Sequence, residues 1–282
     1  MLALFLLAAA PFSGSSAFEF TRQAVAFGPR PPGSPAIQKL QGFLLTKLKS
    51  FGCEVSEESF SAATPAGSVP MKNILCRLKG SDGRRALVVT GHYDTKPMPG
   101  RPFVGANDGG SSTGFLLELA RSAAGQPRKS DLWIVFFDGE EAQISWTAQD
   151  SLYGSRHQAQ RWAQSGFLAR IEALINVDMI GDKDLNLLRD FNSSPKLVNL
   201  VWQAAQDLGY SKHFESSGTA MEDDHMPFRR MGVEALDLID FEYGTLNRNW
   251  HTERDTMDKL SAGSFEVVGR VVVETLRRLD QE

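Results

Sequence analysis

Apolar residues follow two patterns along this chain, and each pattern predicts one kind of element. Short apolar runs that end abruptly at a polar residue predict buried strands, because a strand covered on both faces has no side that meets water. Apolar residues three and four positions apart predict helices with one buried face. The predicted strands cover residues 53–60, 71–78, 86–90, 132–137, 173–177 and 235–239. The predicted helices cover residues 18–27, 35–51, 111–123, 195–208 and 262–279, with a further helix that follows the polar stretch 150–157.

The order of these elements predicts the fold class. Strands alternate with helices over most of the chain, and two strands near the front are joined by the turn-rich stretch 61–68. Alternation of this kind is typical of a parallel sheet with helices on both faces, and the early pair adds an antiparallel part. We therefore predict an α/β fold, a three-layer α/β/α domain around a mixed, mostly parallel central sheet.

Composition and charge fit one globular domain and exclude one class of partner. The chain has 282 residues, of which 42% are hydrophobic and 23% charged, so it can bury a substantial core. Its formal net charge is -4, and its Lys and Arg residues form no cluster. This charge distribution excludes a nucleic-acid partner.

The first residues resemble a leader rather than part of the domain. Residues 2–11 are mostly apolar, and small residues follow up to Ala17, although no Lys or Arg precedes the apolar run. This pattern predicts a signal peptide over residues 1–17 and a single catalytic domain over residues 18–282. We accordingly expect a secreted or periplasmic protein whose mature form has no stable insertion in a membrane.

The two cysteines, Cys53 and Cys76, both fall in the predicted antiparallel pair of strands. A cross-strand disulfide is one interpretation, and in an exported protein it would add stability. Two buried thiols are the other interpretation. The sequence leaves both open.

Acidic residues and a histidine follow three of the predicted strands. The run 132–137 is followed by Glu140 and Glu141, and two other strands end at His92 and Asp178. Adjacent carboxylates repel one another unless a cation or a bound proton relieves the repulsion, which suggests one metal ligand and one proton carrier. Ligands of open α/β sheets bind outside the carboxyl ends of the strands. A solvated acidic turn would explain one such strand end, but repetition at three strands favours a site.

Two further candidates lie outside the strands. Asp108 lies in the glycine-rich stretch 105–110 that precedes a predicted helix, and His251 follows Trp250. Glycines allow a backbone to approach a ligand closely. Taken alone, however, Asp108 could be a helix cap and His251 an ordinary core or surface histidine.

Taken in order, these residues resemble the ligand set of the zinc aminopeptidases with two co-catalytic metal ions. A narrower resemblance is to the glutaminyl-peptide cyclotransferases, or glutaminyl cyclases, within the same superfamily. The motifs that carry it are FFDGEEA at 136–142, Trp146, QDSLYGSRH at 149–157, DDHMPF at 223–228 and WHT at 250–252.

The resemblance to the cyclases implies a role for most candidate residues. Asp108, Glu141 and His251 match the ligands of a single zinc ion, and Glu140 matches the acid/base that transfers the proton. Asp178 and Asp223 match an aspartate pair near that glutamate. Trp146 and Trp250 match aromatic residues of the substrate pocket. His92, together with Asp178, would bind a second zinc ion in the aminopeptidases.

Two positions depart from the pattern of the cyclases. Glu222 stands where a neutral Gln is usual, and Asp237 where a pocket His is usual, so both add negative charge to the expected substrate pocket.

The resemblance implies zinc-dependent cyclisation of the N-terminal glutamine of peptides or proteins to pyroglutamate, with release of ammonia, by a monomeric enzyme with one zinc ion per chain. Two alternatives stay open. A di-zinc aminopeptidase would hydrolyse N-terminal residues with Glu140 activating a water molecule. A catalytically silent peptide-binding domain is the other, although the complete ligand set argues against it.

Overall fold

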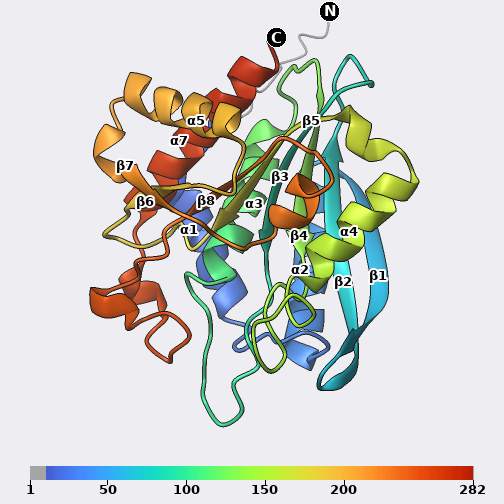
Figure 1. Ribbon diagram of the computed structural model, residues 1–282, viewed down its shortest axis with the longest axis vertical. Coiled ribbons are helices and arrows are strands. Elements are labelled where there is room, and N and C mark those ends of the chain that lie inside the picture. The colour runs from blue at the N-terminus through green and yellow to red at the C-terminus, as the bar shows by residue number, and fades with distance from the viewer. Residues whose placement is uncertain (1–10, 282) are drawn as a thin grey trace, which may run out of the picture.

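The protein, a computed structural model that describes residues 11–281, is built around one twisted sheet with helices on both sides (Figure 1). The six strands of this sheet lie in the order β1-β2-β4-β3-β5-β8. Strands β4, β3, β5 and β8 are parallel neighbours, and β2 pairs with β4 and β1 in the antiparallel sense. The predicted α/β/α fold with a mixed, mostly parallel sheet is confirmed.

Most predicted elements are present, with shifted ends. The strands of the main sheet are β1 (Glu54–Thr64), β2 (Gly67–Leu78), β3 (Ala86–His92), β4 (Asp131–Phe137), β5 (Ile171–Asp178) and β8 (Ala235–Ile239). The helices are α1 (Gly14–Val25), α2 (Pro35–Ser50), α3 (Gly110–Ala123), α4 (Tyr153–Gln164), α5 (Pro195–Asp207), α6 (Met226–Arg229) and α7 (Ala262–Leu279).

The apolar side chains of each strand divide between two cores, one on each face of the sheet. Alternate residues of a strand point to opposite faces, so Val89 belongs to one core and Val88 to the other. The larger core packs under α1, α2, α3, α5 and α7, and the smaller one under α4 and α6. Burial on both faces explains why the parallel strands have continuous apolar runs instead of alternating ones.

The β1/β2 hairpin is longer than the apolar pattern predicts. Pairing continues to Thr64 and Gly67, so only Pro65 and Ala66 form the turn, and most of the stretch predicted as a loop is strand. The extra residues are mostly exposed, and they pair through their backbones without an apolar pattern that would reveal them.

A disulfide joins Cys53 and Cys76 across this hairpin, with a sequence separation of 23. The alternative of two buried thiols is therefore wrong. Replacing both cysteines by alanine is expected to lower the free energy of unfolding by about 3 kcal/mol, because the unfolded chain regains the freedom of the open loop. Urea unfolding of the variant and of the reduced wild type measures this loss, and the two curves should agree. Free thiols in the denatured, unreduced wild type would contradict the bridge.

The amino-terminal helix begins earlier than predicted and lies inside the fold. Ala17 is fully buried in α1, and the backbone N–H groups of Ser13 and Gly14 donate to Glu118 (2.8 Å) and Glu266 (2.7 Å). The predicted boundary at Ala17 therefore falls within α1, and the leader over residues 1–17 stays a prediction. Residues 1–10, the greater part of the predicted leader, lie outside the described residues.

A small parallel pair, β6 (Leu187–Asp190) with β7 (Phe214–Thr219), has no counterpart in the sequence prediction. Both strands are short, and half of β7 is exposed and polar, so neither gives an apolar run. The pair lies beside β8, and the carboxylate of Asp190 on β6 accepts the N–H of Met221 (2.8 Å) in the segment that precedes α6.

Candidate active site

The candidate residues meet at the carboxyl ends of neighbouring strands. His92 is the last residue of β3 and Asp178 the last of β5, while Glu140 and Glu141 follow β4 after a sharp turn. Gly139 makes this turn with φ 70°, and a Cβ there would lie 2.5 Å from the sulfur of Met71. Only glycine fits such a position, which explains the DGEE sequence.

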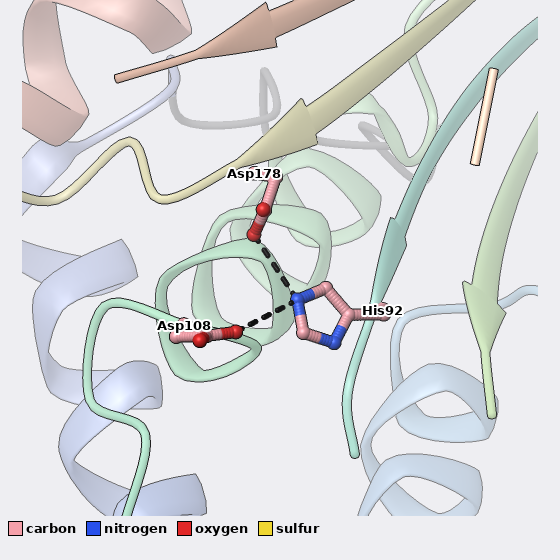
Figure 2. Close-up of side chains that lie close together, drawn as sticks. All are labelled: His92, Asp108 and Asp178. Atoms are coloured by element: carbon pink, nitrogen blue, oxygen red, sulfur yellow. Dashed lines mark hydrogen bonds and ion pairs between the residues drawn. The ribbon is translucent and has the colours of Figure 1, made fainter. Parts of the chain in front are cut away.

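The first group of candidate ligands consists of His92, Asp108 and Asp178. Nε2 of His92 lies 3.3 Å from Oδ1 of Asp108 and 3.1 Å from Oδ1 of Asp178 (Figure 2). All three side chains are buried, and both carboxylates point at the same ring nitrogen.

The second group consists of Asp108, Glu141 and His251. Nε2 of His251 lies 2.8 Å from Oε1 of Glu141 and 3.2 Å from Oδ2 of Asp108. Asp108 therefore directs one carboxylate oxygen to each histidine and belongs to both groups. The residues predicted to bind metal are brought together, in two sets that share one carboxylate.

The donor atoms of both groups suit a metal such as zinc, which is bound in proteins by histidine nitrogens and carboxylate oxygens. Oε2 of Glu141 is buried and accepts no hydrogen bond from the described residues, and Nζ of Lys96 lies 3.7 Å from it. A buried carboxylate oxygen without a donor is costly unless a cation compensates it. The residues present therefore fit a metal ion.

Two further buried carboxylates fix the backbone from which the ligands extend. Asp94 accepts the N–H groups of Glu140 (3.2 Å) and Glu141 (3.3 Å). Asp255 accepts the N–H groups of Asn107 (2.8 Å) and Asp108 (3.1 Å), and the hydroxyl of Tyr243 donates to it over 2.8 Å. Asp94 also lies 3.4 Å from Nδ1 of His92, as expected for a carboxylate that orients a metal-binding histidine.

Arg30 holds the loops on either side of these anchors. Its guanidinium is fully buried and donates to the carbonyls of Tyr93 (3.3 Å), Val104 (2.6 Å) and Gly105 (3.1 Å), and to that of Gly28 (3.1 Å). Burial lowers the pKa of Arg30 to about 10, which leaves the side chain charged at neutral pH.

Glu140 occupies a position suited to proton transfer. Burial raises its pKa well above the ordinary value of a glutamate; His92 opposes the rise, and neighbouring carboxylates such as Glu141 add to it. Burial likewise raises the pKa of Asp178 to about 7. Burial alone would lower the pKa of His251, but hydrogen bonds to Asp108 and Glu141 raise it to about 9. A cation is thus favoured among these carboxylates, whether proton or metal.

A cavity of about 350 Å³ opens beside these groups. Its walls combine metal-binding residues, acids and apolar side chains. They are Asp108, Glu140, Glu141, Trp146, Asp178, Met179, Met221, Glu222, Asp223, Ile239, Phe241, Trp250 and His251. Trp146, Trp250, Glu222 and Asp223, which the resemblance suggested, are all among these wall residues.

The backbone around the cavity contains strained conformations. Met179 and His251 have φ of 49° and 51°, in the left-handed region that non-glycine residues rarely adopt. Such strain is often found at functional sites, where the surrounding structure enforces it. Trp250, stacked at 4.0 Å on the ring of His251, contributes to this enforcement.

Asp237 does not line the cavity, and its assignment to the substrate pocket stays a prediction. It lies on β8 two residues before Ile239, which places it deeper in the sheet on the same side of the strand. Its carboxylate accepts a hydrogen bond from Asn176 (3.0 Å), and burial raises its pKa well above the ordinary value. It is a buried group behind the acids of the site.

Several residues that shape the site were not singled out from the sequence. Met179, Met221, Ile239 and Phe241 line the cavity, but each reads as an ordinary apolar residue. Asp255 carried a weak sequence signal, since it is an acid four positions after His251.

A second hollow lies far from this chemistry. An apolar groove of about 470 Å³ is lined by residues such as Leu87 and Leu132, at the amino-terminal ends of β3 and β4. Neither candidate metal group lines it. The smaller cavity with acids and metal ligands is therefore the candidate active site.

Comparison with known proteins agrees with this geometry. The sequence profile of peptidase family M28 matches residues 73–276. A glutaminyl-peptide cyclotransferase of Boiga irregularis is 32% identical over 285 aligned positions, which cover 86% of this chain and 75% of the relative.

Solved structures of a glutaminyl cyclase and of a protein described as an aminopeptidase match nearly the whole chain. A glutaminyl cyclase from an Acidobacteriales bacterium is 41% identical with a TM-score of 0.93, and the match covers 100% of this chain and 99% of that one. A Bacteroides thetaiotaomicron protein described as a leucine aminopeptidase precursor is 26% identical with a TM-score of 0.86, over 95% of this chain and 98% of that one.

Proposed function

Because this chain belongs to peptidase family M28 and to its glutaminyl-peptide cyclotransferases, we propose that its cavity cyclises N-terminal glutamine. The enzyme converts the first residue of a peptide or protein to pyroglutamate and releases ammonia. The observation that carries the proposal is the position of Glu140, a buried carboxyl of raised pKa beside a complete set of metal ligands in a partly aromatic cavity.

The reaction is internal to the substrate. The α-amine nitrogen bonds to the carbon of the side-chain amide, the bond from that carbon to the amide nitrogen breaks, and a five-membered lactam and ammonia result. Glu140 accepts a proton from the attacking amine and returns it to the departing nitrogen. Its raised pKa suits both transfers, because an acid/base works best when its pKa is close to the working pH.

We assign the metal to Asp108, Glu141 and His251, with one zinc ion per chain. When bound, the ion would act as a Lewis acid toward the amide oxygen. The protein itself holds amine and amide together, because a substrate bound in the cavity, whose walls include Trp146 and Trp250, keeps the two groups in contact. Burial raises the pKa of Glu140, the carboxylate of Asp223 adds to the rise, and Asp178 lines the same cavity.

A di-zinc aminopeptidase is the second candidate function, and one observation favours it. His92, Asp108 and Asp178 form a second group of potential ligands, and Asp108 could bridge two ions. A hydrolase of this kind would use Glu140 to activate water and would cut the first peptide bond.

We also propose export and a monomeric state. Disulfides persist mainly in oxidising compartments, so the bridge between Cys53 and Cys76 supports a secreted or periplasmic location. Within residues 11–281, no helix has both the length and the apolar character needed to cross a bilayer.

A peptide that begins Gln-Phe separates the two functions. We expect the purified protein to release one ammonia per peptide, block the amino terminus to amine reagents and leave every peptide bond intact, because the nucleophile belongs to the substrate. Mass spectrometry and an ammonia assay measure these changes. The reaction should stop with a zinc chelator and resume when zinc is added.

A leucine anilide is the matched control, since it offers a cleavable amide but no side-chain amide to cyclise. Glutaminyl cyclisation predicts no cleavage of this compound. Free glutamine without ammonia from the peptide, together with cleavage of the anilide, would replace the cyclase by the aminopeptidase.

A further inference from the structure

The mouth of the active-site cavity is marked by two of its wall residues. Trp146 and Glu222 are strongly exposed, with 42% of the Trp146 surface and 41% of the Glu222 side chain open to solvent. Glu140, Glu141 and Asp108, by contrast, are buried. The reacting glutamine must reach the buried groups, so the rest of the peptide leaves on the side of the exposed wall residues.

Trp146 is presented on a fixed loop. The carboxylate of Asp150 accepts the backbone N–H groups of Gln143 (2.8 Å), Ile144 (2.9 Å) and Ser145 (2.8 Å), just ahead of Trp146. The hydroxyl of Tyr153 donates to the same carboxylate over 2.7 Å. Because the loop is already fixed, a substrate side chain can pack against the exposed indole of Trp146 with little loss of conformational entropy in the loop.

The charge at the mouth is one-sided. Acids line the cavity from its base to Glu222, and none of the described residues in its wall is Lys or Arg. At the mouth, the negative charge of Glu222 is partly neutralised by Arg230 at the end of α6, whose guanidinium pairs with the Glu222 carboxylate. Both side chains are exposed, and pairs of this kind are weak enough to be exchanged for another cation.

From this arrangement we propose that Trp146 and Glu222 form a subsite for the second residue of the substrate and that this subsite favours a cationic side chain. The inference rests on the proposed cyclisation and adds its substrate class: peptides that begin Gln-Lys or Gln-Arg. A Lys or Arg side chain would lie against the indole face and reach the Glu222 carboxylate. An acidic second residue would meet the acids of the wall; Arg230 pairs with Glu222 at the mouth, and Nζ of Lys96 lies 3.7 Å from Oε2 of Glu141 among the buried groups.

Three peptide amides that differ at one position test the proposal: Gln-Lys-Phe, Gln-Ala-Phe and Gln-Glu-Phe. For the wild type, kcat/KM for ammonia release is expected to follow the order Lys, Ala, Glu, with Lys exceeding Glu by about fivefold or more. The preference should shrink in high salt, because salt screens charges at an exposed mouth. Equal kcat/KM for the Lys and Glu peptides would overturn the proposal.

Two variants should move the preference in opposite directions. Glu222→Gln removes the carboxylate and is expected to reduce the Lys/Glu ratio by about threefold, whereas Arg230→Gln frees the carboxylate and should raise the ratio by about twofold. Glu215→Gln, at an exposed position on β7 outside the cavity wall, changes the net charge as Glu222→Gln does and should leave the ratio unchanged. A ratio that is the same in all variants, or one that changes as much in Glu215→Gln, would refute a subsite at Glu222.

Binding separates this inference from the proposed reaction. Calorimetry with Glu140→Gln, which cannot turn the peptides over, should give a lower Kd for the Lys peptide than for the Glu peptide. If this preference is found but the wild type releases no ammonia, the cyclisation fails and the subsite stands. If ammonia is released without any preference in rate or binding, the subsite fails alone.

Discussion

Glu140→Gln is expected to lower kcat for ammonia release by about two or more orders of magnitude, as for the loss of a general acid/base. The amide keeps the shape of the side chain but cannot take the proton of the substrate amine. Zinc content and thermal unfolding should stay close to the wild type, since Glu140 belongs to neither group of candidate ligands. Steady-state kinetics and elemental analysis of one preparation measure both quantities.

Glu242→Gln provides the control for this variant. Glu242 is exposed and lies outside the cavity wall, so the same chemical change there should leave kcat unchanged. Near-normal turnover in Glu140→Gln would exclude Glu140 as the acid/base. Loss of turnover together with loss of zinc would instead make it a residue of the metal site.

The second large effect is expected from the histidines. His251→Ala should reduce the zinc content from about one ion per chain to almost none, because three protein ligands are needed at such a site and one is removed. His92→Ala should leave that ion bound if the cyclase assignment holds. Elemental analysis after gel filtration distinguishes the two variants.

The same pair of variants separates one metal ion from two. An aminopeptidase-type site would hold two ions in the wild type, and His92→Ala and His251→Ala would each lose one. His213→Ala, which lies on a short helix away from both ligand groups, is the control and should keep the wild-type content. Full zinc retention in His251→Ala would contradict the ligand assignment.

Much of the fold could be predicted because its central strands are buried on both faces. Strands β3, β4, β5 and β8 appear in the sequence as apolar runs, and the larger helices appear as apolar stripes. The ends of the β1/β2 hairpin and the small β6/β7 pair could not be predicted in this way. Their pairing depends on backbone hydrogen bonds, which leave no apolar signature.

The site was predictable where function requires a particular side chain. Asp108, Glu140, Glu141 and His251 stand in motifs whose residue types follow from the chemistry, and the fold brings them together. Asp237 lies outside the cavity wall; a resemblance gives the position of a residue in the chain, while its depth in the fold depends on the strand that carries it. The sequence alone does not distinguish a buried carboxyl behind the cavity wall from one that lines the cavity.

The contacts of Arg30 have a consequence for the energetics of metal capture. Its guanidinium bonds the carbonyls of Tyr93 and Gly105, and Asp255 accepts the N–H of Asp108 just before α3. These contacts form when the protein folds, so the conformational entropy of both loops is lost at that stage. The loops that deliver Asp94 and Asp108 are therefore preorganised. Metal binding therefore does not have to order these loops, and the affinity for zinc depends mainly on the ligands themselves. We expect the metal-free protein to stay folded and to bind zinc again without refolding.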